Sequence, residues 1–160
     1  MRVQIDQYYP KDGVELVEAN GAAIARLVKD VQTAPGPEEG QEIITANVVQ
    51  ITLPLGIEKA DVLAHFDYYF AKGEAEELAR ALPLKEDRVE RLLSATDYKA
   101  LKVADGAMTA EEYEPWKKLR AHWRDTIHKM RACKNVDELN EIKYAETPEG
   151  LDDLEAAGAA

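Results

Sequence analysis

Residues 88–131 read RVERLLSATDYKALKVADGAMTAEEYEPWKKLRAHWRDTIHKMR and contain both tryptophans of the chain. Five large apolar residues in this stretch recur every three or four positions, which is the spacing of one helical face. They are Trp116, Leu119, Trp123, Ile127 and Met130. The pattern predicts a helix to about residue 131 that buries this face. We expect a shorter amphipathic helix to end near residue 97, and a linker with a turn at Asp105-Gly106 to join the two.

The start of the long helix is marked by the sequence Thr109-Ala-Glu-Glu112, which fits a capping box. In this arrangement the Thr109 hydroxyl accepts from the Glu112 amide, and the Glu112 carboxylate accepts from the Thr109 amide. Pro115 offers an alternative start, because proline is well suited to the first position of a helix. The capping box favours the earlier start, with a kink where the Pro115 ring removes one backbone hydrogen bond.

The N-terminal half carries the strand signals. Residues 2–8 and 42–53 are predicted strands, because β-branched residues alternate there with polar neighbours. Residues 14–18 fit either a strand or a helix. Residues 35–40, which read PGPEEG, indicate a loop.

A first helix is predicted over residues 21–32. Its apolar side chains follow the i, i+3, i+4, i+7 pattern typical of a buried helical face. They are Ile24, Leu27, Val28 and Val31. Asn20-Gly21 before them is interpreted as a turn or as the cap of this helix.

Two more helices are expected before residue 83. Asp61 can cap the first and Gly73 can close it, and the second covers residues 74–82 and ends at Pro83. A short helix is also expected around residues 136–142.

These elements predict an α+β fold with a small N-terminal β element and a mainly helical C-terminal half. The division we expect is an α+β region over residues 1–83, a helical region over 84–147 and a flexible acidic tail over 148–160. The tail has only Leu151 and Leu154 to bury, so we expect it to be loosely held unless a partner binds it.

Charge is distributed unevenly along the chain. The 160 residues carry a net charge of −11, which argues against a nucleic-acid partner because phosphate binding needs clustered cations. Residues 116–134 nevertheless hold seven Lys or Arg and one Asp, a charge of +6 that leaves −17 for the remainder. One interpretation pairs these cations with acidic helices of the same chain. The other directs them at an acidic patch on a partner protein. No apolar run is long enough to span a bilayer, so we expect no membrane partner.

Metal and cofactor sites are not expected. His122, Asp125 and His128 are spaced three apart on the long helix, but a metal site needs convergent ligands and no second set is evident. His65 accompanies apolar residues on its helix and is interpreted as a partly buried histidine. No phosphate-binding loop, nucleophile elbow or zinc-protease motif occurs, so the sequence predicts a protein that is not an enzyme.

Cys133 is the only cysteine, which rules out an internal disulfide and favours a reducing compartment. Arg131 and Lys134 lie beside it and could lower its pKa. Because no partner base is evident, we interpret Cys133 as a partly buried structural thiol. The pair Tyr68-Tyr69 fits a contact surface or the core equally well.

The order of residues between 88 and 124 resembles the C-terminal region of tail assembly chaperones and tail-fibre assembly proteins of tailed phages. The pattern is R-x-x-LL-x-x-TDY, a linker with DG-x-MT-x-EEY, and then W-x-x-x-R-x-x-x-R. The matching residues are Arg88, Leu92, Leu93, Thr96, Asp97, Tyr98, Asp105, Gly106, Met108, Thr109, Glu111, Glu112, Tyr113, Trp116, Arg120 and Arg124. The chain departs from this family in its acidic, Ala-rich end.

The resemblance implies a non-enzymatic chaperone that binds a phage tail or tail-fibre protein during virion assembly. The alternative is a structural adaptor of a phage tail or baseplate. Either would act in the host cytoplasm during assembly or remain in the virion tail. The residues expected to contact the partner are Trp116, Arg120, Trp123 and Arg124. Arg120 and Arg124 are one helical turn apart, so we expect them to share an accessible face.

Overall fold

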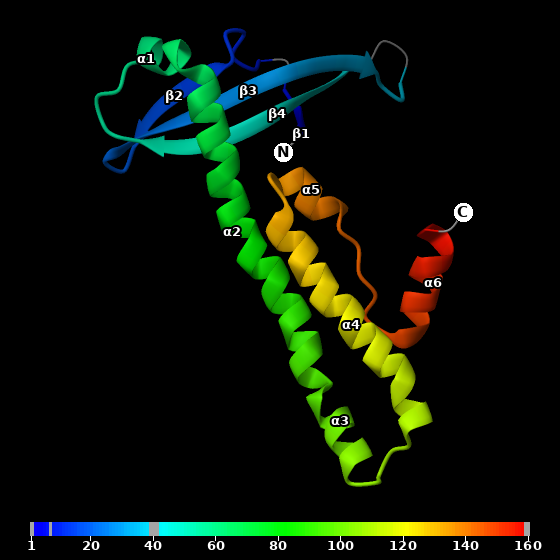
Figure 1. The fold of residues 1–160 in the computed structure, drawn as a ribbon. Helices are drawn as coiled ribbons and strands as arrows, with labels where there is room; N and C mark the ends of the chain where they lie inside the picture. Colours follow the sequence, from blue (N-terminus) through cyan, green and yellow to red (C-terminus); the bar gives the residue numbers. More distant parts are fainter. Residues whose placement is uncertain (1, 7, 39–41, 159–160) are drawn as a thin grey trace. The chain divides into compact units, whose positions relative to one another are not determined.

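The computed structural model describes residues 2–6, 8–38 and 42–158 (Figure 1). The chain divides into two compact units. The sheet unit comprises Met1–Ala79 and Asn135–Asp137, and the helical unit comprises Arg80–Lys134 and Glu138–Ala160. The α+β class predicted from the sequence is confirmed, with helices in the C-terminal half.

The sheet unit contains an antiparallel sheet of four strands in the order β1-β4-β3-β2. The strands are β1 (Arg2–Ile5), β2 (Val14–Ala19), β3 (Ala22–Pro35) and β4 (Glu42–Leu53). β4 covers the predicted residues 42–53, and β1 covers the first part of 2–8, of which residue 7 lies outside the described residues. The ambiguous residues 14–18 belong to a strand.

The helix predicted over residues 21–32 is wrong, because this segment is strand β3. Asn20 and Gly21 have φ angles of 52° and 79°, and Ala19 pairs with Ala22 across them, so they form a two-residue hairpin turn. Leu27 and Val28 are both buried because successive strand residues face opposite sides of the sheet. Two buried faces therefore produce an apolar spacing that imitates one helical face.

One face of the sheet is covered by α1 (Lys59–Ala64) and the start of α2 (Phe66–Ala95). The buried residues of this core are Val14, Ala23, Ala25, Leu27, Val49, Ile51, Leu53, Val62 and Phe70. Tyr69 packs against it, whereas Tyr68 is exposed, so the tyrosine pair is divided between core and surface. The opposite face carries a smaller cluster around Ile5, Val28 and Ala46.

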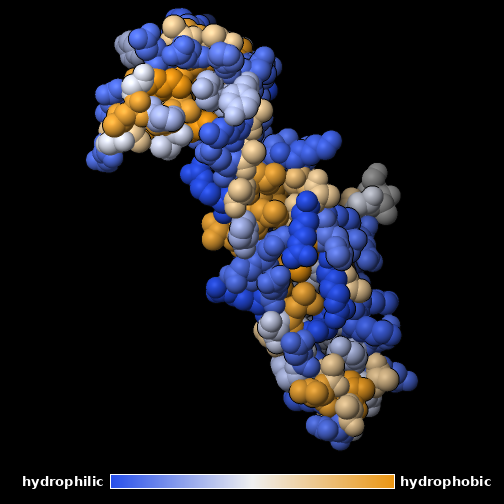
Figure 2. All heavy atoms as spheres, turned by 60° about the vertical axis from the view of Figure 1, so that its left-hand side comes forward, coloured by the Kyte–Doolittle hydropathy of each residue, from blue (hydrophilic) through white to orange (hydrophobic). Residues whose placement is uncertain are grey.

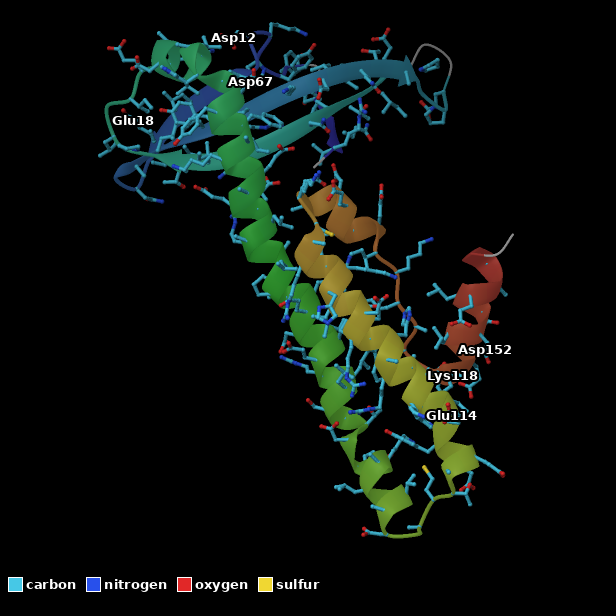
Figure 3. The ribbon with its side chains drawn as sticks, in the orientation of Figure 1. Asp12, Glu18, Asp67, Glu114, Lys118 and Asp152 are labelled. Carbon is cyan, nitrogen blue, oxygen red and sulfur yellow. The ribbon has the colours of Figure 1, made fainter. Side chains whose placement is uncertain are left out.

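Ion pairs link the surface of the sheet unit. Lys59 Nζ lies 2.7 Å from Asp12 Oδ2, and Lys29 Nζ lies 3.1 Å from Asp67 Oδ1. Figure 3 labels Asp12 and Asp67, both of which lie in this unit. The hydrogen bond from Lys59 holds the pKa of Asp12 below its usual value, so this carboxyl group is charged at neutral pH.

The helix predicted from Asp61 to Gly73 is divided between α1, which ends at the C-cap His65, and the start of α2. The helix predicted over residues 74–82 also belongs to α2, so Gly73 and Pro83 lie in its interior. Asp61 is the third residue of α1, within a capping box made with Glu58. Gly73 does not close a helix, because its missing side chain lets α2 approach Val49 of the sheet. Pro83 does not end one, because it is exposed and α2 has buried anchors on either side of it in Phe70 and Val89.

The helical unit is built from the end of α2, followed by α3 (Asp97–Ala104), α4 (Ala110–Ala132) and α6 (Pro148–Gly158). The short helix predicted near residues 136–142 is present as α5 (Val136–Glu141). The segment predicted as a linker before Asp105-Gly106 is helical, and the turn there is confirmed, with a φ angle of 72° at Gly106.

Residues 148–158 of the expected tail form α6. Leu151 is buried, and the Thr147 hydroxyl accepts a hydrogen bond from the Gly150 amide at the start of the helix. α6 contacts α4, and Lys118 and Asp152 line a hollow of about 100 Å³ between them (Figure 3). The buried Leu151 and the Thr147 cap thus stabilise a helix in a segment whose composition predicts little burial.

Gly73→Ala should lower the free energy of unfolding of the sheet unit by about 1–3 kcal/mol. Alanine favours a helix over glycine by roughly 1 kcal/mol, but a Cβ at residue 73 would lie 2.9 Å from Val49 Cγ2 and 3.0 Å from Val49 Cβ. The measurement is urea unfolding of the parent, Gly73→Ala, Val49→Ala and the double variant. The four proteins form a double-mutant cycle. If the effects of Gly73→Ala and Val49→Ala on the free energy of unfolding were additive, the explanation would be contradicted.

Candidate partner-binding surface

The start of α4 matches the predicted capping box. The Thr109 hydroxyl accepts from the Glu112 amide at 3.1 Å, and the Glu112 carboxylate accepts from the Thr109 amide at 2.8 Å. The Glu112 carboxylate also accepts from the Thr109 hydroxyl at 3.0 Å, and the two hydrogen bonds that it accepts from Thr109 hold the pKa of Glu112 below its usual value. Pro115 lies inside the helix, so the alternative start at Pro115 is wrong.

The apolar stripe of α4 forms the core of the helical unit. Leu119, Trp123, Ile127 and Met130 are buried, and Trp116 is half-buried. The Trp123 indole nitrogen donates a hydrogen bond of 2.7 Å to the Ala145 carbonyl, which satisfies the polar atom of this buried ring. Trp123, expected to contact a partner, therefore contacts the chain itself.

Arg120 lies in a buried polar network at the junction of α2 and α3. Its guanidinium donates to the Leu93 carbonyl at 2.7 Å, the Thr96 hydroxyl at 2.6 Å and the Asp97 carboxylate at 2.6 Å. Only 8% of Arg120 is exposed, whereas Arg124 is exposed. The expectation that the two arginines share an accessible face is wrong, because the guanidinium of Arg120 is directed at the end of α2.

Most cations of residues 116–134 pair within the helical unit. Arg131 lies 2.9 Å from Glu86 and 3.8 Å from Glu90 on α2. Lys129 lies 2.7 Å from Asp125, and Lys117 lies 3.4 Å from Glu114. These contacts support the interpretation that the basic segment pairs with acidic residues of its own chain. Within the described part of the chain, Arg124 forms no ion pair.

The surface of the helical unit carries an aromatic and apolar group on α3. We define the α3 surface by Tyr98, Lys99, Leu101, Lys102 and the neighbouring Trp116. Tyr98 is 48% exposed and Leu101 is 64% exposed. Lys99 lies over the Trp116 ring at 3.8 Å from its centre, and Lys102 lies over the Tyr98 ring at 5.2 Å. Figure 2 shows hydrophobic side chains at the end of the helical unit where α3 meets the turn to α4.

Sequence reasoning missed the α3 surface because residues 98–104 were interpreted as a linker. The available signal was the pair Tyr98 and Leu101, which are three residues apart and therefore neighbours on a helix. Of the four residues predicted to bind a partner, Trp116 and Arg124 keep accessible surface, and only Trp116 joins the α3 surface.

The three residues considered as metal ligands do not form a common site. Among the described residues, no group of three or more His, Cys, Asp or Glu side chains is placed to hold a metal ion. Asp125 pairs with Lys129, His128 is exposed, and His122 Nε2 is buried without a hydrogen-bond partner. Burial, and then the charge of Lys129, lower the pKa of His122.

The interpretation of His65 is wrong, whereas that of Cys133 as a partly buried thiol is confirmed. His65 is exposed rather than partly buried, because it follows the last turn of α1 and its ring contacts the Asp61 carbonyl at 3.1 Å. Cys133 is half-buried, and burial raises the pKa of its thiol instead of cations lowering it. Its sulfur donates to the Lys129 carbonyl at 3.4 Å, in agreement with a structural thiol.

Comparison of the chain with protein-family models, with curated proteins and with solved structures finds no match. In the described part of the chain, no helix has the length and apolar character needed to cross a membrane. A functional proposal therefore depends on the residue pattern and on the surfaces that the helical unit presents.

Arg120→Met should lower the free energy of unfolding by about 2–3 kcal/mol, because it leaves buried acceptors without their charged donor. Arg120→Lys should recover only part of this loss, since an ammonium cannot reproduce a guanidinium fork. The matched control is Arg124→Met on the exposed side of α4, which should change stability by less than about 0.5 kcal/mol. Equal effects of the two methionine substitutions in urea unfolding would refute the role of Arg120.

The His122 environment predicts a pH-dependent contribution to stability. The folded chain lowers the pKa of His122 below its ordinary value of 6.5, so the unfolded chain binds this proton more readily. The stabilisation is complete above pH 6.5 and is lost as the pH falls through the folded pKa. The stability of the parent relative to His122→Gln should therefore be greater at pH 7.5 than at pH 5.5. Thermal unfolding at the two pH values measures this, and an unchanged difference would count against it.

Proposed function

We propose that this protein is a non-enzymatic assembly chaperone that binds a phage tail or tail-fibre protein, and that the α3 surface contacts this partner. The observation that carries the proposal is the exposure of Tyr98 and Leu101 on a helix whose base is fixed by Arg120. Exposed apolar side chains on a rigid element favour binding, because little ordering is needed when the partner arrives.

The residue pattern that resembles phage assembly proteins supports the same proposal. Its Arg120, Thr96 and Asp97 meet in one network, and its Thr109 and Glu112 start α4. Most of these pattern residues build the helical hairpin, while Tyr98 and Trp116 lie at its surface. The pattern thus combines a scaffold with the surface that the scaffold presents.

The charge of the chain suits a chaperone role. A protein of net charge −11 keeps an aggregation-prone partner in solution through repulsion between complexes. The lysines of the α3 surface contact aromatic rings, and among the described residues Lys99 and Lys102 form no ion pair. They can therefore meet carboxylates of a partner without breaking an ion pair of their own.

Co-expression with candidate tail and tail-fibre proteins tests the proposal. We expect one of them to co-purify with the parent and to become more soluble in its presence. Leu101→Glu should abolish co-purification, because it places a charge at the centre of the contact. Leu55→Glu is the matched control, since Leu55 is an exposed leucine of the sheet unit and 55% of it is accessible.

Each result is interpretable when circular dichroism shows that the variants are folded. Binding by Leu101→Glu equal to that of the parent would exclude the α3 surface. A lack of binding to any tail or tail-fibre protein would contradict the chaperone role. Recovery of the protein in purified particles, at a fixed ratio to a tail component, would instead favour the structural adaptor.

A further inference from the structure

A groove of about 320 Å³ crosses the helical unit at a site separate from the α3 surface. It is lined by Ala81, Leu84, Lys85 and Arg88 of α2 and by Leu139, Asn140 and Tyr144. The four α2 residues follow the i, i+3, i+4, i+7 spacing and so form one helical face. Leu84 is 76% exposed, more than any other large aliphatic residue among those described. Figure 2 shows a hydrophobic area along α2, surrounded by hydrophilic surface.

The charges of this groove have one sign. Its lining includes two cations and no Asp or Glu, in a chain with 31 acidic and 20 basic residues. Lys85 Nζ donates to the Leu139 carbonyl, a neutral acceptor, and among the described residues it has no carboxylate partner. Its charge therefore remains available to an incoming anion.

Arg88 supplies the second cation. Its guanidinium lies 2.6 Å from the Glu146 carboxylate, and this contact raises the pKa of Arg88. Both side chains are more than half exposed, so water screens the pair and a competing carboxylate can replace Glu146 at small cost.

We propose that this groove receives an apolar side chain of a partner protein whose neighbouring carboxylate binds Lys85 and Arg88. The volume suits one aromatic or branched side chain, which would cover Leu84 and displace water from it. A guanidinium binds carboxylates through paired hydrogen bonds, and an ammonium adds a point charge. The occupant is an acidic segment of a protein, and the identification of that protein as a tail protein rests on the function proposed above.

The first test uses a small probe, so that it does not depend on a natural partner. The probe is 3-phenylpropionate, which joins a phenyl ring to a carboxylate, and 3-phenylpropan-1-ol lacks the charge. In NMR titrations of the full chain, we expect saturable shifts of Leu84, Arg88 and Tyr144 with the carboxylate and weaker binding of the alcohol. Leu84→Glu should abolish these shifts. Leu101→Glu, which changes another exposed leucine on the α3 surface, should retain them.

Three results would overturn the proposal: no shift at these residues, equal binding of the alcohol, or shifts that persist in Leu84→Glu. Because Leu84 is exposed, the substitution should leave the fold intact, and the spectrum of the variant verifies this.

The second test uses overlapping peptides of whichever tail or tail-fibre protein co-purifies. A peptide with an apolar residue beside Asp or Glu should bind the parent and lose binding to Leu84→Glu, but not to Leu101→Glu. If peptides bind only through Leu101, the groove is not the docking site although the chaperone role stands. If the phenylpropionate titration succeeds and no tail protein binds, the proposed function fails while the ligand preference of the groove is supported.

Discussion

The guanidinium of Arg120 is the contact on which the helical unit depends. α2 ends at Ala95, and the last carbonyls of a helix have no partner within it. Arg120 donates to one of these carbonyls, at Leu93, while it also binds Thr96 and the Asp97 carboxylate. The Thr96 amide and hydroxyl also donate to the Leu93 carbonyl, and the guanidinium of Arg120 joins this end of α2 to the start of α3. The direction of α3, and with it the exposure of Tyr98, follows from this junction.

Local chemistry made parts of the fold predictable. The box at Thr109 and the β-branched alternation of β4 are determined by neighbours a few residues apart, and both were predicted with the correct bounds. The bounds of β3 and α2 were not predicted correctly. Pairing with a distant strand places Leu27 and Val28 on opposite faces of a sheet, and the close approach of Val49 explains the glycine at residue 73. Periodicity and punctuation within one segment do not contain that information.

The candidate site shows the same limit. Arg120 and Arg124 are one turn apart, and their spacing suggested a shared face. The better signal is the drift of a helix, because a step of four residues at 3.6 residues per turn rotates the position by about 40°. This drift leaves Arg120 closer to the centre of the apolar stripe than Arg124. An arginine at such a position must find buried acceptors, and the Thr96-Asp97 pair supplies them. Arg124 lies outside the stripe and stays exposed.

The pairing of charges then determines which surfaces remain for a partner. Arg131 and Lys129 form ion pairs with acidic residues of their own unit. The net positive charge of residues 116–134 is therefore larger than the charge available to a partner. In the described part of the chain, Lys85 meets a carbonyl and Lys99 meets an aromatic ring, neither of which carries a negative charge. Lys85 lies beside the exposed Leu84 in the groove, and Lys99 lies 5.3 Å from the centre of the exposed Tyr98 ring. The chain has a net charge of −11, yet among the described residues these lysines form no ion pair and lie next to exposed apolar side chains. Such a surface favours a partner that supplies both a carboxylate and an apolar side chain.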